Sequence, residues 1–102
     1  MNEIYLDYAA TAPLDPLVGA AMHECLLREF GNPSSQHAAG RRARTLVEAA
    51  RTAVAARVGA STERIVFTSG ATESNNLALQ GVLRRSRGRR VHVVTSRIEH
   101  KS

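Results

Sequence analysis

The stretch IVFTSGATESNNLALQGVLRRSRGRRVHVVT, residues 65–95, decides the fold class. Its first four residues form an apolar run without alternation, which is typical of a strand covered on both faces. The turn SGATE at 69–73 leads into an expected helix through Val82, and residues 91–95 form a second apolar run. A strand, a helix and a strand at this spacing predict a parallel, right-handed βαβ unit, and therefore an α/β protein.

An extended arm and a first helix are expected before this unit. Residues 1–14 alternate only briefly and are punctuated by proline, which suits an N-terminal arm, and residues 15–102 are assigned to the domain that follows. Asp15 is expected to cap a helix that begins with proline and ends at Gly31. Cys25 lies on the apolar stripe of that helix and is expected to be a small core residue.

A second helix is expected over residues 38–58. The loop before it, GNPSS at 31–35, is a turn by composition, and its serines are candidate helix caps. Gly59 is well placed to end the helix. The pattern therefore predicts two helices between the arm and the βαβ unit.

Composition excludes several classes of protein. The chain has 102 residues, 43% of them hydrophobic, with no run of about 20 apolar residues and no N-terminal signal pattern, so a cytoplasmic, non-membrane protein is expected. A single cysteine excludes an intrachain disulfide and a thiolate metal cluster, and no metal site is expected. The net charge of +5 comes from RRSRGRR at 84–90. That run has no interleaved aromatic residue, so nucleic-acid binding is not favoured.

The turn at 68–72 is a candidate anion site. It follows a predicted strand and opens a helix, so backbone N–H groups should point outward at the positive end of the helix dipole. Gly70 would let an oxygen approach the backbone, and the Ser69 and Thr72 hydroxyls would add donors. The alternative is that Ser69 only caps the helix and Thr72 only closes the turn. The turn matches neither a Walker A loop nor a Rossmann fingerprint.

His100 is a second candidate, because it follows the predicted strand at 91–95. Two adjacent parallel strands would bring it to the same sheet edge as the anion turn. An imidazole there could stack on a flat ring and exchange a proton near neutral pH. The alternative is a loop histidine that faces water beside Glu99.

Four strings in order carry a family resemblance: IYLDYAATAPLDP from Ile4, FGNPSSQH from Phe30, IVFTSGATESNNLAL from Ile65 and IEHKS from Ile98. Together they resemble the N-terminal part of the class V aminotransferases, specifically the cysteine desulfurases of the NifS and IscS type. The resemblance runs nearly end to end. It implies the start of an aspartate aminotransferase-like, fold type I large domain, incomplete here, that uses pyridoxal 5′-phosphate.

The resemblance also implies roles for particular residues. It assigns the cofactor phosphate to Ala71 and Thr72, and assigns ring stacking and proton movement to His100 as a catalytic residue. It places Ala10, Thr11 and Asn32 loosely at the substrate mouth and dimer contact. The implied reaction converts L-cysteine to L-alanine and transfers the sulfur to an enzyme cysteine as a persulfide. Ala12 departs from the family, which usually has threonine there.

Relatives of this type run several times longer, so the Schiff-base lysine, the aspartate at the ring nitrogen and the persulfide cysteine are expected beyond Ser102. The 102-residue chain alone is therefore expected to be inactive. A homodimer and a sulfur-acceptor protein are the implied partners. The alternatives are a selenocysteine lyase-like enzyme of the same fold, a non-catalytic truncated remnant, and a small basic nucleic-acid-binding module.

Overall fold

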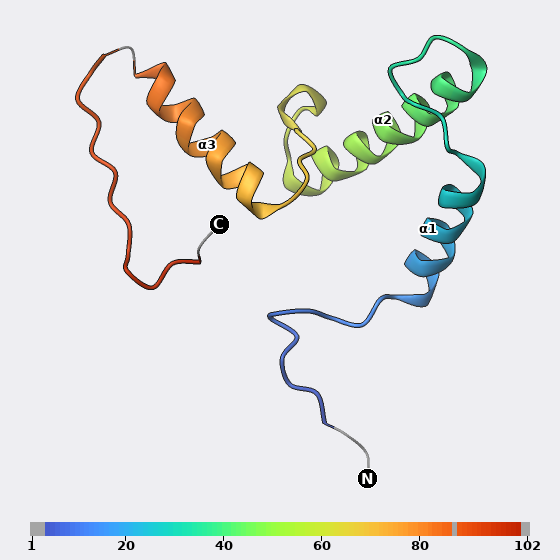
Figure 1. Ribbon diagram of the computed structural model, residues 1–102, viewed down its shortest axis with the longest axis horizontal. Coiled ribbons are helices and arrows are strands. Elements are labelled where there is room, and N and C mark those ends of the chain that lie inside the picture. Colours follow the sequence, from blue (N-terminus) through green and yellow to red (C-terminus); the bar gives the residue numbers. More distant parts are fainter. Residues whose placement is uncertain (1–3, 87, 101–102) are drawn as a thin grey trace. The chain divides into compact units, whose positions relative to one another are not determined.

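The computed structural model describes residues 4–86 and 88–100 (Figure 1). The chain separates into two compact units, Met1–Thr62 and Glu63–Ser102. The element order is α1 (Pro16–Arg28), α2 (Ala38–Val58), the 3-10 turn η1 (Thr62–Arg64) and α3 (Ala71–Arg85). The first three residues of the predicted arm, one arginine of the basic run and the last two residues of the final motif (Met1, Asn2, Glu3, Arg87, Lys101 and Ser102) lie outside the described residues.

Helix α1 begins where the sequence predicts. Asp15 is its N-cap and accepts a hydrogen bond from the Leu17 amide at 2.7 Å, with proline at the first helical position. The predicted end at Gly31 is wrong, because Glu29, with φ −115° and ψ 57°, already leaves the helical region after Arg28.

The prediction that Cys25 is a core residue is also wrong, because its side chain is exposed. The described residues around α1 cover little of its apolar stripe. Val18, Met22 and Leu26 on the same stripe are exposed as well.

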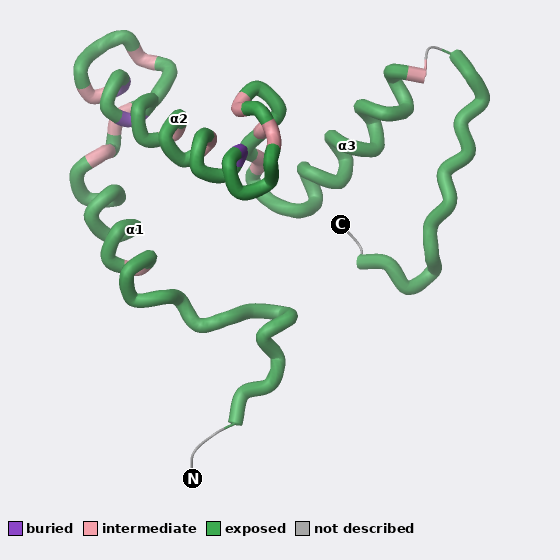
Figure 2. Tube along the Cα trace, turned by 180° about the vertical axis from the view of Figure 1, so that it is seen from behind, coloured by how far each residue is buried: buried purple, intermediate pink, exposed green. Residues whose placement is uncertain are grey.

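Helix α2 confirms the prediction at both ends, and it ends at Gly59 with φ 63°, the left-handed conformation that glycine adopts easily. The serines before it are not its cap: His37 is, through its ring nitrogen. Among the described residues, the buried positions all lie in α2, at Gly40, Ala43 and Ala55 (Figure 2).

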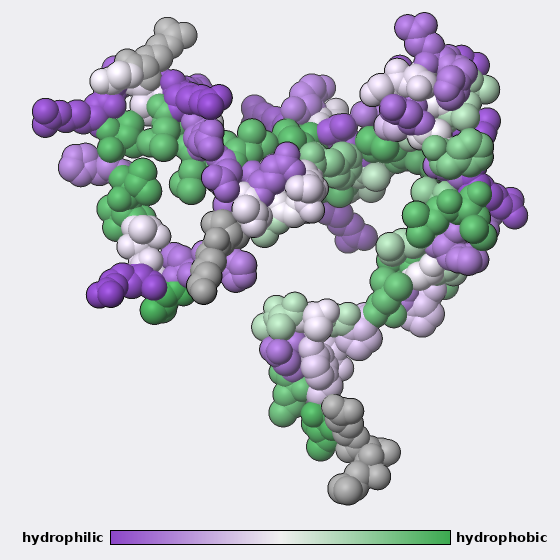
Figure 3. Space-filling view, viewed as in Figure 1, coloured by the Kyte–Doolittle hydropathy of each residue, from purple (hydrophilic) through white to green (hydrophobic). Residues whose placement is uncertain are grey.

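Helix α3 forms as predicted, but the two flanking strands do not. Within residues 4–86 and 88–100 there is no strand, and residues 65–68 and 91–95 are irregular. A strand is held by a ladder of hydrogen bonds to a neighbouring strand, and these two segments make no ladder with each other. Ile65 is half-buried, and the other apolar side chains of the two segments are exposed, Phe67 by 49% and Val94 by 94%. Hydrophobic side chains accordingly lie on the visible surface (Figure 3).

In the part of the chain that the structure describes, every helix is too short or too polar to span a membrane.

Candidate functional site

The N-terminus of α3 leaves its first amides open. Gly70 is the N-cap, in an extended conformation with φ 164° and ψ −174°, and it makes no side-chain capping bond. A Cβ on Gly70 would meet nothing within 4 Å. Since the first N–H groups of a helix have no partner inside it and carry the positive end of the dipole, those of Ala71 and Thr72 can bind an anion.

Thr72 offers both a backbone and a side-chain donor at this end. Its carbonyl accepts a hydrogen bond from Asn76 Nδ2 at 2.8 Å, one turn further along α3. Its hydroxyl makes no hydrogen bond within the described residues. The Thr72 side chain is therefore available to a ligand.

Ser69 has a partner that the sequence analysis missed. Glu73 Oε2 accepts hydrogen bonds from the Ser69 amide and from the Ser69 hydroxyl, both at 2.7 Å. The Ser69 hydroxyl is thus engaged with Glu73, and it does not cap α3 as one sequence interpretation had it. These two bonds, the amide first, hold the pKa of the Glu73 carboxyl below its ordinary value. The signal was present in the sequence: an acidic residue three positions after an N-cap often reaches back to the backbone before the helix.

His100 lies near the middle of α3. It lines an open hollow of about 390 Å³ together with Thr95 and Glu99 of its own segment and with Asn75, Ala78 and Leu79 of α3. Ala71 and Thr72 are not part of that lining. Within the second unit, His100 therefore shares a hollow with the middle of α3.

Ala10 and Thr11 lie in a tight turn of the N-terminal arm. Their amides donate to the Asp7 carbonyl at 3.1 Å and 3.3 Å. The Tyr5 hydroxyl lies 3.0 Å from the Asp7 carbonyl and 3.1 Å from the Thr11 carbonyl, and its ring packs edge-on against Tyr8 at 5.2 Å. The arm turn is thus closed by its own aromatic residues.

Asn32 holds the loop before α2 together. Its side-chain oxygen accepts from the Ser34 amide at 2.8 Å, and its carbonyl accepts from the Ser35 amide at 2.9 Å. The loop then passes directly over Gly40, where a Cβ would collide with the Ser35 carbonyl and lie 2.7 Å from the Asn32 carbonyl. In the described residues no hydrogen bond joins Asn32 to the arm turn.

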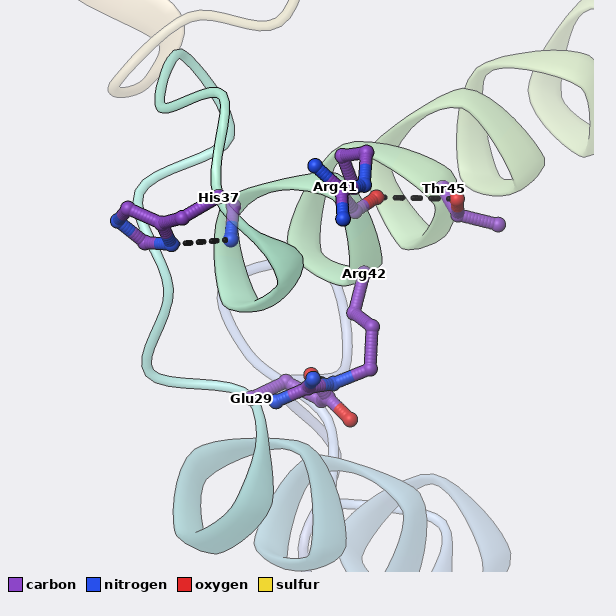
Figure 4. A network of polar contacts seen from close by, with 6 residues as sticks. Glu29, His37, Arg41, Arg42 and Thr45 are labelled. Carbon is purple, nitrogen blue, oxygen red and sulfur yellow. Dashed lines mark hydrogen bonds and ion pairs between the residues drawn. The ribbon is translucent and has the colours of Figure 1, made fainter.

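Polar side chains at the start of α2 also form contacts there (Figure 4). His37 Nδ1 accepts from the Gly40 amide at 3.3 Å, and Arg42 pairs with Glu29 at 3.2 Å. Arg44 Nε donates to the Pro33 carbonyl at 2.8 Å. His37 therefore has a structural role, and no group of three His, Cys, Asp or Glu side chains in the described ranges could hold a metal ion.

The basic run lies at the C-terminal end of α3. Its described arginines are exposed, and Arg84 donates to the Gln80 side chain at 3.2 Å. None of these arginines forms an ion pair with a carboxylate of the described residues. Arg84 and Arg85 lie in the last turn of α3, where positive charge stabilises the helix through its dipole.

Comparison with known proteins identifies what this chain is similar to. The model of the family described as aminotransferase class-V matches residues 4–102. The chain is 50% identical over 99 residues to the cysteine desulfurase IscS of Dictyoglomus turgidum, 53% over 102 residues to that of Pseudomonas aeruginosa, and 52% over 102 residues to that of Azotobacter vinelandii. Each match covers 97% of the chain and 25% of the relative. The chain thus spans about a quarter of the length of the curated relatives that it matches.

Proposed function

The chain belongs to the aminotransferase class-V family, and on that premise we propose that it is the N-terminal segment of a pyridoxal-phosphate-dependent cysteine desulfurase. The observation that carries the proposal is an identity of 50–53% to three proteins named cysteine desulfurase IscS, over 97% of this chain. The proposed reaction takes L-cysteine to L-alanine and passes the sulfur to an enzyme cysteine.

The first turn of α3 fits the phosphate group of the cofactor. A phosphate monoester accepts several hydrogen bonds and is stabilised at the positive end of a helix. The uncapped amides of Ala71 and Thr72 would supply backbone donors, and the Thr72 hydroxyl would supply a third. The open space at Gly70 leaves room for the phosphate oxygens.

The pyridine ring of the bound cofactor supplies an electron sink for the substrate carbon. His100 is proposed to stack on that ring and to move a proton, which a histidine does readily near neutral pH. This role requires residues 65–68 and 91–95 to pair as parallel strands in the full-length protein, because that pairing would bring His100 to the phosphate turn. Ala10, Thr11 and Asn32 are proposed to line the substrate mouth, with Asn32 acting through the loop that it holds.

The remaining parts of the proposal rest on the family resemblance. The full-length protein would be a cytoplasmic homodimer that delivers sulfur to an acceptor protein. Its Schiff-base lysine and persulfide cysteine would come from sequence outside these 102 residues.

The test is a desulfurase assay on the full-length protein that carries this segment. L-cysteine with pyridoxal phosphate should yield alanine and enzyme-bound sulfur in equal amounts. Thr72→Val should weaken cofactor binding about tenfold, as expected for a lost hydrogen bond to a charged group. The matched control is Thr52→Val, because the Thr52 hydroxyl only bonds the Glu48 carbonyl within α2. Turnover of L-selenocysteine but not of L-cysteine would instead favour a selenocysteine lyase-like enzyme.

A further inference from the structure

Glu73 forms a clasp across the turn that opens α3, made by its carboxylate and Ser69. One carboxylate oxygen accepts both the Ser69 amide and the Ser69 hydroxyl, each at 2.7 Å. Hydrogen bonds to an ionised acceptor are shorter and stronger than neutral ones. The two bonds therefore fix the position of Ser69 relative to the first turn of α3, although both residues are exposed.

A second link lies alongside the clasp and holds the carbonyl of Gly70. The hydroxyls of Thr68 and Ser74 lie 2.6 Å apart, and they lie 3.2 Å and 3.1 Å from the Gly70 carbonyl oxygen. Each hydroxyl has one proton to donate, so at most two of these three contacts are hydrogen bonds at any one time. The Ser74 amide also donates to the Gly70 carbonyl, at 3.1 Å.

Holding the Gly70 carbonyl determines where the next amide points. The carbonyl of Gly70 and the N–H of Ala71 belong to one planar peptide group and point in opposite directions. Since the carbonyl is directed into α3, the Ala71 N–H is directed away from the helix. The links at Ser69 and at Gly70 thus preorganise the donors that a phosphate would use.

The charge of Glu73 is consistent with this arrangement. Its carboxylate lies in the first turn of α3, where the helix dipole favours negative charge, and it is occupied by Ser69. The bonds from the Ser69 amide and hydroxyl hold the pKa of the Glu73 carboxyl below its ordinary value, so they favour its ionised form. The stabilisation that it gives is present above the ordinary glutamate pKa and is lost as the pH falls through the lower folded-state pKa.

We propose that Glu73 is a positioning residue for the cofactor phosphate: it holds Ser69 so that the amides of Ala71 and Thr72 stay open and aligned toward the ligand. This inference rests on the proposed function, since it concerns the same phosphate site. It assigns Ser69 to the support of that site, and leaves phosphate contact to Ala71 and Thr72.

The experiment compares two ligands of the full-length apoenzyme that differ only in the phosphate, pyridoxal phosphate and pyridoxal. Glu73→Ala should raise the dissociation constant of pyridoxal phosphate about tenfold and leave that of pyridoxal unchanged, because the clasp acts on the phosphate turn alone. Glu73→Gln, which keeps an acceptor oxygen without the charge, should fall in between. Ser69→Ala should raise the dissociation constant of pyridoxal phosphate less than Glu73→Ala does, because the bond from the Ser69 amide to Glu73 remains.

Glu24→Ala is the matched control, because Glu24 is an exposed helical glutamate whose partner, Arg28 at 2.9 Å, lies in α1. It should change neither constant. Equal weakening of both ligands by the Glu73 variants, or no change for either, would overturn the inference while leaving the proposed function intact. A wild-type apoenzyme that binds neither ligand would instead refute the proposed function itself. If Glu73→Ala does not fold, Glu73→Gln serves as the test. An increase in its dissociation constant for pyridoxal phosphate relative to that for pyridoxal supports the inference, and an unchanged ratio overturns it.

Discussion

The turns that precede α2 and α3 differ in whether the chain itself closes the N-terminus of the helix. The loop before α2 is closed by its own residues: His37 caps the helix, and two loop carbonyls lie against Gly40. The turn before α3 is open: Gly70 provides no side-chain cap, and nothing lies within 4 Å of the position that its Cβ would take. Gly40 in the first turn of α2 and Gly70 at the N-cap of α3 therefore meet different neighbours.

The difference separates a structural glycine, Gly40, from a glycine at the proposed phosphate site, Gly70. At Gly40 the protein itself fills the space that a side chain would need. At Gly70 the protein leaves that space empty and leaves the neighbouring donors unused. A bound anion requires an open helix N-terminus, whereas the space at a closed one is already filled by the protein itself.

The largest effect, a loss of stability, is expected from Gly40→Ala. The new methyl group would collide with the Ser35 carbonyl and approach the Asn32 carbonyl to 2.7 Å, and backbone atoms cannot move aside cheaply. Overpacking of this kind costs about 1–3 kcal/mol. Urea unfolding should show a loss of that size in the free energy of unfolding.

The control for this substitution is Gly81→Ala in α3, because a Cβ there meets nothing within 4 Å. Alanine is a better helix former than glycine, so this variant should be more stable by about 0.5–1 kcal/mol. Equal effects of the two substitutions would show that the loop does not pack on Gly40 as described.

Local signals made much of the helical structure predictable. Asp15 followed by proline marked the start of α1, and Gly59 marked the end of α2, because caps depend on adjacent residues. The cap of α2 was assigned to the wrong residues, since a histidine nitrogen can accept the same bond as a serine oxygen. The strands at 65–68 and 91–95 were predicted but are not formed, because a strand depends on a partner that is distant in sequence.

The same distinction applies to the candidate site. The turn alone predicted outward-pointing amides, because the first amides of a helix are free of partners inside it, and the family resemblance assigned Ala71 and Thr72 to the phosphate. The clasp between Ser69 and Glu73 is also local, and the capping spacing would have indicated it. The position of His100 depends on how its segment pairs, which no local pattern determines.

A smaller effect, on ligand binding alone, is expected from Gly70→Ala. The extended backbone of Gly70 suits alanine, and no protein atom lies in the way, so the free energy of unfolding of the apoenzyme should change by less than about 0.5 kcal/mol. The methyl group would occupy the space proposed for a phosphate oxygen. The dissociation constant of pyridoxal phosphate should rise about tenfold, equivalent to about 1.4 kcal/mol. Unchanged affinity would mean that the phosphate does not lie against Gly70.

The smallest effect is expected from His37→Ala, which removes the cap of α2. The bond from the Gly40 amide to His37 is 3.3 Å long, near the upper limit for a hydrogen bond, so the loss should fall at the low end for N-caps, about 0.5 kcal/mol. His37→Asn should restore the stability, because asparagine is a preferred cap. His23→Ala in α1 is the control, since His23 is exposed and caps no helix.

Both histidine variants should leave the affinity for pyridoxal phosphate unchanged, because the loop before α2 is closed by the chain itself. If His37→Ala weakened that affinity while His23→Ala did not, the closed turn would also serve the ligand. The contrast between a structural turn and a ligand-binding turn would then fail, whereas a change confined to the free energy of unfolding supports it.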